Sequence, residues 1–228
     1  MHKFTVLNTD VFNYLLAHQS PASKYLAALR EQTDQHRLAE MCTAENQVSF
    51  MVLIAKLMRA KKIIEVGVFT GVTTLALAEV IKNDSAGKII ACDISDEFTN
   101  VGEPYWVEAG VREKIELKIA PAKATLFSLV ENPVEKNSFD LIYIDADKAG
   151  YIEYFNLAMQ LIRPGGLILA DNALRSGEVV NAHSEDKTTQ YLIRFNQHVK
   201  QMQLQDPSLF DFNLLPIGDG LMMILKNK

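Results

Sequence analysis

The fold is decided by residues 62–71, which read KIIEVGVFTG. The first five positions are rich in isoleucine and valine and too few for a helix, so they predict a buried β-strand. Gly67 and Gly71 then allow the backbone to turn tightly and to come close to a bound molecule. A helical stretch at 72–82 follows directly. The segment therefore predicts one strand–turn–helix unit of an α/β protein.

The same alternation continues along the chain. Short apolar runs predict further strands at 88–93, 115–119, 139–145 and 166–171, and the stretches between them predict helices at 98–109, 122–130 and 151–162. Strand and helix in this order imply right-handed crossovers and a doubly wound, mainly parallel sheet. The runs 212–215 and 221–225 are joined by a turn-rich segment, which predicts a C-terminal antiparallel hairpin and brings the sheet to seven strands.

The first sixty residues are helical in pattern. Ser20 and Pro21 open one predicted helix, and Thr43 is the expected N-cap of the next. We therefore expect one domain over residues 1–228, with an N-terminal helical extension at 1–60 and an α/β core at 61–228.

Composition excludes several classes of protein. The chain has 228 residues, of which 48% are hydrophobic and 22% charged, and its net charge is −5 without a basic block, so a nucleic-acid partner is not expected. The two cysteines, Cys42 and Cys92, lack CxxC spacing, which argues against zinc or a disulfide framework and suits a reducing compartment. No apolar stretch has the length of a membrane span. We expect a cytoplasmic protein without a membrane partner.

Ligands in open α/β sheets bind beyond the carboxyl ends of the strands. The loop 65–71 lacks the GxGxxG spacing of a pyrophosphate cradle, and Glu65 would repel a phosphate but suit a cationic cofactor. A purely structural turn is the alternative interpretation. Asp93 ends the second strand and is placed to accept the hydroxyls of a ribose, or else to cap the following helix.

Three oxygen donors follow two further strands. Asp145 ends the strand 139–145, and Asp171 with Asn172 ends the strand 166–171. Because parallel strands meet at the same edge, these side chains predict a partial shell for a hard cation such as Mg²⁺ or Ca²⁺. The five histidines are scattered, so zinc, copper and non-haem iron are not expected. Helix capping by the aspartates is the alternative.

Lys148 lies three residues after Asp145. A lysine is ordinarily protonated and no use as a base, but a nearby cation and partial desolvation both favour its neutral form. The same cation would make a coordinated phenol more acidic. Lys148 is therefore a candidate general base, although most lysines are simply solvated.

These landmarks resemble one family from end to end. The segment 41–43, the loop 65–71, Asp93, the run 120–122, the run 144–148, the pair 171–172 and the turn 218–220 occur in the order found in the caffeoyl-CoA and catechol O-methyltransferase group of class I methyltransferases. The chain resembles the bacterial members most. The resemblance implies the Rossmann-like fold of that class, a small phenolic substrate and a homodimer.

The resemblance also implies roles for single residues. Lys148 would be the general base beside Asp145, and Asp145, Asp171 and Asn172 would bind a divalent cation, with Mg²⁺ expected and Ca²⁺ or Mn²⁺ as alternatives. S-adenosylmethionine would contact Thr43, Glu65, Gly67, Val68, Thr73, Asp93, Ala122, Asp145 and Asp147.

Two departures from the family pattern concern the substrate and one loop. Where the plant caffeoyl-CoA enzymes carry Trp and Asn after the metal-binding pair, this chain has Arg175 and Ser176, which puts caffeoyl-CoA itself in question. Tyr151, Arg175 and Ser176 are the candidates for substrate contact. Ala120 replaces a glycine, which is tolerable where the backbone needs no positive φ.

The expected reaction is in-line transfer of a methyl group from S-adenosylmethionine to a hydroxyl of a catechol-like or caffeoyl-type molecule, with two vicinal hydroxyls chelating the cation. Three alternatives stay open: an NAD-dependent oxidoreductase, a cofactor-binding module without catalysis, and a methyltransferase acting on RNA or protein. The 65–71 spacing speaks against the first, Lys148 and the three-ligand set against the second, and the acidic balance against an RNA substrate.

Overall fold

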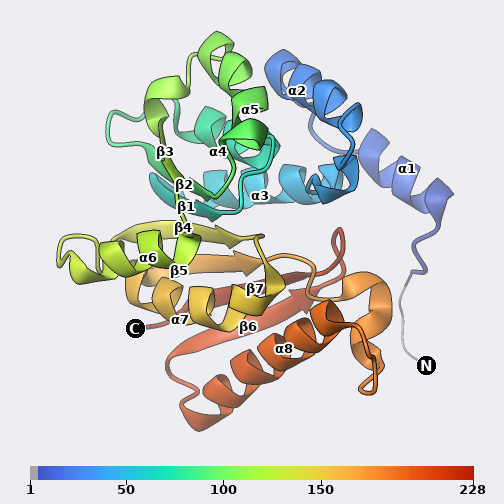
Figure 1. Ribbon diagram of the computed structural model, residues 1–228, viewed down its shortest axis with the longest axis vertical. Helices are drawn as coiled ribbons and strands as arrows, with labels where there is room; N and C mark the ends of the chain where they lie inside the picture. Colours follow the sequence, from blue (N-terminus) through green and yellow to red (C-terminus); the bar gives the residue numbers. More distant parts are fainter. Residues whose placement is uncertain (1–4) are drawn as a thin grey trace.

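A seven-stranded mixed sheet with the order β3-β2-β1-β4-β5-β7-β6 runs through the molecule (Figure 1). The computed structural model describes residues 5–228, so the first four residues of the expected extension 1–60 lie outside the described part. The strands are β1 (Lys62–Val66), β2 (Lys88–Asp93), β3 (Ile115–Ile119), β4 (Phe139–Ile144), β5 (Ile162–Ala170), β6 (Phe210–Leu215) and β7 (Leu221–Lys226).

The strand pairing confirms the predicted topology. Strands β3, β2, β1, β4 and β5 pair in parallel, and β7 runs antiparallel to both β5 and β6. Strand order reverses between β1 and β4, which is where open α/β sheets bind their ligands.

Helices cover both faces of the sheet (Figure 1). Helices α2 to α5 pack on one face, and α6 to α8 pack on the other. The α-helices are α1 (Thr9–Ala17), α2 (Lys24–Asp34), α3 (Glu45–Leu57), α4 (Val72–Ile81), α5 (Asp96–Glu108), α6 (Ala122–Glu131), α7 (Tyr151–Leu161) and α8 (Lys187–Gln205), and short 3₁₀ turns lie at η1 (Ala39–Met41), η2 (Arg112–Lys114), η3 (Lys148–Gly150) and η4 (Arg175–Val180).

Burial on both faces explains why the central strands are continuously apolar. In β1, Ile63 belongs to the core under α2–α5, whereas Ile64 and Val66 belong to the core under α6–α8, and all three are fully buried. Glu65 lies on the Ile63 side of the strand because successive side chains alternate. A carboxyl group is therefore placed inside the protein at the end of β1.

Some helix boundaries differ from the predicted ones. The N-cap of α3 is Ala44, which makes no side-chain cap, so the prediction for Thr43 is wrong; its hydroxyl contacts Tyr143 and Thr73 instead. The N-cap of α2 is Ser23 rather than Ser20, because its side chain accepts from the backbone N–H of Leu26.

Helix α8 is absent from the predicted elements. It buries Thr189, Leu192, Phe195 and Val199 on one face, but polar residues dilute that pattern. Its start is fixed by Asp186, whose carboxylate accepts from the Thr189 N–H at 2.8 Å. Among residues 5–228, no helix is long and apolar enough to cross a membrane, and both cysteines are free thiols.

Candidate active site

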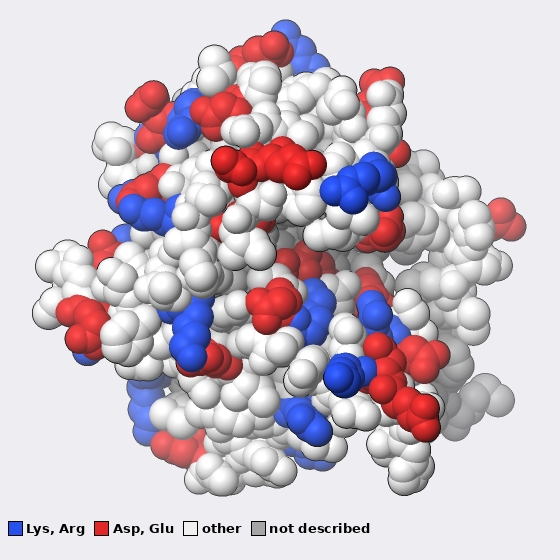
Figure 2. Space-filling view, viewed as in Figure 1, with Lys and Arg blue, Asp and Glu red and all other residues white. Residues whose placement is uncertain are grey.

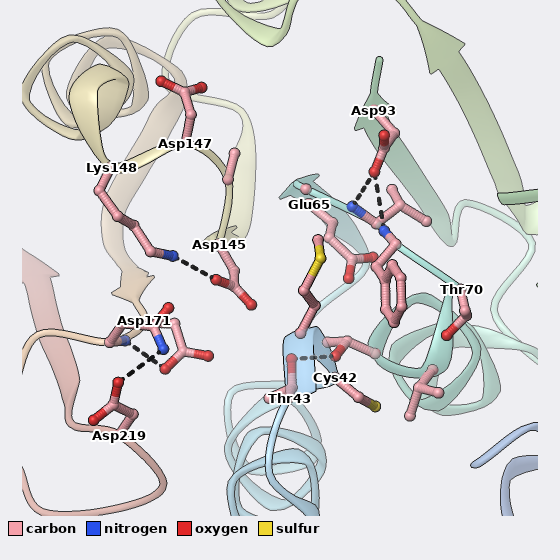
Figure 3. A pocket seen from close by; sticks show the side chains of 18 of the residues that line it. Cys42, Thr43, Glu65, Thr70, Asp93, Asp145, Asp147, Lys148, Asp171 and Asp219 are labelled. Atoms are coloured by element: carbon pink, nitrogen blue, oxygen red, sulfur yellow. Dashed lines mark hydrogen bonds and ion pairs between the residues drawn. The ribbon is translucent and has the colours of Figure 1, made fainter. Parts of the chain in front are cut away.

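A cavity of about 1050 Å³ opens at the carboxyl ends of the central strands. Its walls come from the segments that follow strands β1 to β5, together with residues before and at the start of α3 and the turn between β6 and β7. All of the predicted site residues except Tyr151 line it. Figure 3 shows Asp145, Lys148 and Asp171 on one side of this cavity and Asp93 on the other, with Glu65 between them.

The loop after β1 brings the backbone close to the end of β4. Gly67 has φ +93°, and a Cβ at this position would overlap with the carbonyl oxygen of Asp145. The Gly67 N–H donates to the Cys92 carbonyl at 2.9 Å, so the loop is also tied to β2. Only glycine fits this close approach, which explains the residue type at position 67.

Glu65 is a buried carboxyl group at the floor of the cavity. It is 1% exposed and accepts a hydrogen bond from the Thr74 hydroxyl of α4. Burial raises the pKa of Glu65 to about 8, and the charges of Asp145 and Asp93 act in the same direction. A positively charged ligand near this group would favour its ionised form.

Asp93 holds the loop as well as lining the cavity. Its Oδ2 accepts from the backbone N–H groups of Val68 and Phe69 at 2.8 and 2.9 Å (Figure 3). Its Oδ1 accepts from the N–H of Ser95, and Ser95 rather than Asp93 is the N-cap of α5. The structure therefore removes the interpretation of Asp93 as the cap of that helix. Its Oδ1 accepts one hydrogen bond and keeps a lone pair for a further donor, whereas both lone pairs of Oδ2 are used.

Lys148 points at Asp145. The Lys148 Nζ lies 2.8 Å from Asp145 Oδ1 and 2.7 Å from the hydroxyl of Tyr151 (Figure 3 for the Asp145 contact). Tyr151 is fully buried and packs against Phe195. It therefore contacts Lys148 from behind rather than lining the cavity, unlike the substrate contact expected from the sequence.

Asp171 and Asn172 follow β5, next to Asp145 in register, because Ile144 pairs with Ala170. Asp171 is 3% exposed; its Oδ1 accepts from the Asn172 N–H at 2.5 Å, and its Oδ2 accepts from the Tyr143 hydroxyl at 2.6 Å. Burial raises the pKa of Asp171 to about 7, and the charge of Asp145 acts in the same direction.

The Asn172 carboxamide is oriented from the β6–β7 turn. Its Nδ2 donates to Asp219 Oδ2 at 3.2 Å, which directs its Oδ1 away from Asp219. The other oxygen of Asp219 accepts from the backbone N–H of Ser176. Asn172, Arg175 and Ser176 all have positive φ, so Asp219 stabilises a loop of unusual backbone conformation.

This donor set suits a hard divalent cation. Two carboxylates and one amide oxygen come together at the strand ends, one carboxylate is buried beside the charge of the other, and such oxygens are the ligands that Mg²⁺ and Ca²⁺ prefer. Within residues 5–228, no group of three or more His, Cys, Asp or Glu side chains could hold a metal ion, so the amide of Asn172 is needed to complete the predicted set.

Asp147 and Thr43 line the cavity through fixed side chains. Asp147 accepts from the Tyr154 hydroxyl at 2.5 Å and from the Gly150 N–H at 2.9 Å, which caps η3. The Thr73 hydroxyl, at the start of α4, donates to Thr43 Oγ1 at 3.2 Å. Ala122 begins α6 and is 7% exposed. These contacts give the wall a single defined arrangement.

The outer part of the cavity includes Arg175 and Ser176. Arg175 Nε lies 3.8 Å from Asp186 Oδ2, and both side chains are nearly half exposed, so this ion pair is screened by solvent. Ala120, where the family pattern has glycine, is not among the residues with positive φ, which meets the condition under which the replacement is tolerated.

Three polar residues of this region were given no role in the site from the sequence, although Asp219 lies in the turn 218–220 of the family pattern. Gln47 and Asp219 line the cavity, and Tyr143 lies directly behind it. The spacing of Thr43 and Gln47, one helical turn apart, was the available signal for Gln47. Tyr143 gave no signal, because a tyrosine in an apolar strand is most often a packing residue.

Comparison with known proteins decides the family. The sequence model described as O-methyltransferase matches residues 17–227. The chain belongs to this O-methyltransferase family. It is 36% identical over 227 residues to "Probable caffeoyl-CoA O-methyltransferase 2" of Dictyostelium discoideum, covering 96% of this chain and 92% of the relative. It is 33% identical to "Catechol O-methyltransferase domain-containing protein 1" of Mus musculus, covering 96% of this chain and 80% of that protein.

Solved structures of O-methyltransferases have the same fold. A putative O-methyltransferase from Klebsiella pneumoniae superimposes with a TM-score of 0.79 at 29% identity, covering 96% of this chain and 97% of its own. An O-methyltransferase from Bacillus cereus in complex with SAH has a TM-score of 0.81 at 25% identity, covering 96% of this chain and 98% of that one. The Rossmann-like methyltransferase fold and the family resemblance expected from the sequence are both confirmed.

Proposed function

We propose that this O-methyltransferase transfers a methyl group from S-adenosylmethionine to a hydroxyl of a small catechol-like or caffeoyl-type molecule, with a divalent cation, Mg²⁺ before Ca²⁺ or Mn²⁺. One observation carries the proposal: the oxygen ligands Asp145, Asp171 and Asn172 lie beside Lys148 in the cavity that also contains Glu65 and Asp93. A cation site, a base and an acidic cofactor wall are therefore adjacent.

The acidic wall suits this methyl donor. S-adenosylmethionine carries a sulfonium cation and a ribose, and Asp93 is available to the ribose hydroxyls while Glu65 lowers the electrostatic energy of a cation. Thr43, Gly67, Val68, Thr73, Ala122, Asp145 and Asp147 complete the proposed contacts. The Bacillus cereus relative was solved with SAH, which supports the same donor here.

The chemistry requires one new bond and one proton transfer. The substrate oxygen bonds to the methyl carbon, the carbon–sulfur bond breaks, and its electron pair stays on sulfur. Lys148 Nζ receives the hydroxyl proton, and Asp145, at 2.8 Å, orients that nitrogen. When bound, the divalent cation supplies Lewis acidity that makes the hydroxyl easier to deprotonate. Arg175 and Ser176, at the outer part of the cavity, are the proposed substrate contacts.

A small substrate fits the surface of the protein better than a nucleic acid does. On the face shown in Figure 2, the described Lys and Arg side chains are interspersed with Asp and Glu and form no continuous basic patch. We further propose that residues 1–228 form one O-methyltransferase domain, that the protein acts as a homodimer, and that its two free thiols suit the cytoplasm.

The test is transfer of a labelled methyl group from S-adenosylmethionine to a panel of phenols in the presence of Mg²⁺. We expect vicinal diphenols to be methylated and their monohydroxy counterparts to react far more slowly, because one hydroxyl cannot chelate. Equal rates for both series would contradict a chelating site. SAH binding without methylation of any diphenol would favour the module without catalysis, and NAD binding would favour the oxidoreductase.

A further inference from the structure

Tyr143 is the junction between the cofactor wall and the proposed cation ligands. It lies on β4, two residues before Asp145, and its side chain is 1% exposed in the core under α2–α5. Its hydroxyl lies 2.6 Å from Asp171 Oδ2, 3.4 Å from Asp145 Oδ2, 3.1 Å from Thr43 Oγ1 and 3.2 Å from Gln47 Nε2.

The direction of these hydrogen bonds follows from the number of protons. A tyrosine hydroxyl has one proton to donate, and the shortest contact is with the Asp171 carboxylate, which accepts. Gln47 Nε2 can only donate, so it donates to the Tyr143 oxygen. Thr43 then donates to Tyr143 as well, and it accepts from Thr73. Three hydroxyls therefore form a chain of donors that starts at α4 and ends on Asp171.

Tyr143 and Asp171 are linked by the shortest hydrogen bond that the tyrosine hydroxyl makes, at 2.6 Å. Thr43 and Gln47 occupy the lone pairs of the Tyr143 oxygen, so Asp171 is the acceptor for its one proton. Asp171 accepts from the Asn172 N–H on Oδ1 and from Tyr143 on Oδ2, so the Tyr143 hydroxyl helps to fix the plane of its carboxylate.

We infer that Tyr143 is a positioning residue that holds the Asp171 carboxylate in the orientation in which it binds a divalent cation. The inference rests on the metal-dependent function proposed above. Groups that hydrogen-bond to the ligands of a metal orient them, and their removal typically weakens metal binding by about 10- to 100-fold. Without the Tyr143 hydroxyl, Asp171 Oδ2 loses its donor beside the charge of Asp145.

The test is the variant Tyr143→Phe, which keeps the ring in the core and removes only the hydroxyl. Binding of Mn²⁺ alone is measured by electron paramagnetic resonance, and binding of SAH by calorimetry, in the full chain. We expect the Mn²⁺ dissociation constant to rise about 10- to 100-fold while the SAH dissociation constant stays close to that of the wild type. The Tm should fall only by a few degrees, because Thr43 and Gln47 lose a buried partner. Tyr105→Phe, in a half-buried tyrosine of α5 outside the cavity, is the matched control and should bind Mn²⁺ normally.

Each other result overturns the inference in a recognisable way. Wild-type affinity for Mn²⁺ in Tyr143→Phe means that the hydroxyl does not position Asp171. A joint loss of Mn²⁺ binding, SAH binding and thermal stability means that Tyr143 supports the fold and not the ligand. Failure of the wild-type enzyme itself to bind Mn²⁺ contradicts the metal dependence in the proposed function and the inference with it.

Discussion

The Glu65 carboxyl group is buried where its charge is costly. Its pKa is about 8, compared with an ordinary value of 4.5, mainly because burial disfavours the ionised form. The folded protein therefore holds a proton that the unfolded chain releases between these two pH values. Stability from this group is complete below pH 4.5 and is lost as the pH rises toward 8.

The variant Glu65→Gln should remove this pH dependence. We expect the Tm of the ligand-free wild type to fall relative to that of the variant between pH 5 and 8, by several degrees, since about 1 kcal/mol moves the Tm of a domain of this size by about 2–4 °C. Thermal unfolding at a series of pH values measures the difference. Glu79→Gln is the control, because it removes a partly exposed carboxylate from α4, the helix that follows β1. The Tm of this variant should change with pH in the same way as that of the wild type. Parallel curves for Glu65→Gln would mean that Glu65 is ionised in the folded protein.

The Lys148 amine is held by two contacts, and no second lysine within residues 5–228 could replace it as a base in the cavity. It contacts Asp145 and Tyr151 and no other lysine lines the cavity among the described residues. The variant Lys148→Met should lower kcat by about 10²- to 10⁴-fold, the usual contribution of a general base, while SAH affinity is retained. Steady-state kinetics with a diphenol and calorimetry with SAH measure the two effects. A kcat near the wild-type value would exclude Lys148 as the base.

Single residues also mark how far sequence alone could reach. Asp93, Asp145 and Asp171 were predictable because each stands at the end of an apolar strand, and parallel strands bring such ends together. Tyr143 and Gln47 were not, because their contacts depend on the packing of α3 against β4 across almost a hundred residues of sequence. Tyr151 was a candidate for substrate contact, but it is buried outside the cavity, since spacing does not tell which way a side chain at a helix start turns.

The loop between β1 and α4 is the element that joins the two halves of the site. It is tied to β2 through Cys92 and Asp93, and it touches the end of β4 through Gly67. This loop was predicted correctly as a tight glycine turn, because the positive φ values at Gly67 and Gly71 leave few alternatives to glycine. Helix α8 was missed because its apolar face is narrow and its other faces are polar.

A pair of glycine substitutions separates backbone strain from close approach. Gly177 also has positive φ, but a Cβ added there would meet no atom within 4 Å, so Gly177→Ala should cost only about 1–2 kcal/mol of left-handed strain. Gly67→Ala adds an overlap with the Asp145 carbonyl, so we expect a clearly larger drop in Tm and loss of SAH binding. Thermal unfolding and calorimetry measure both. Equal effects of the two variants would show that the loop can move away from β4.

At the scale of the whole molecule, two helical layers cover the sheet and leave the carboxyl ends of its strands open. The helix α3 also carries exposed apolar side chains on the protein surface. Leu53 and Leu57 are 55% and 70% exposed. We expect these side chains to lie at the interface of the proposed homodimer, because exposed leucines on one helix are a poor surface for a monomer. Light scattering on the protein as it leaves a size-exclusion column should give twice the chain mass of 25.6 kDa. A mass of one chain would contradict the dimer and leave the chemistry untouched.

The central claim is that methyl transfer needs a divalent cation held by Asp145, Asp171 and Asn172. The most direct measurement is the initial rate of methylation of a diphenol at fixed S-adenosylmethionine, first in excess chelator and then with Mg²⁺ restored in steps. We predict that the rate falls to background in chelator, returns as Mg²⁺ is added, and does not return in Asp145→Ala. An undiminished rate in chelator would contradict the account and leave the three side chains with structural roles only.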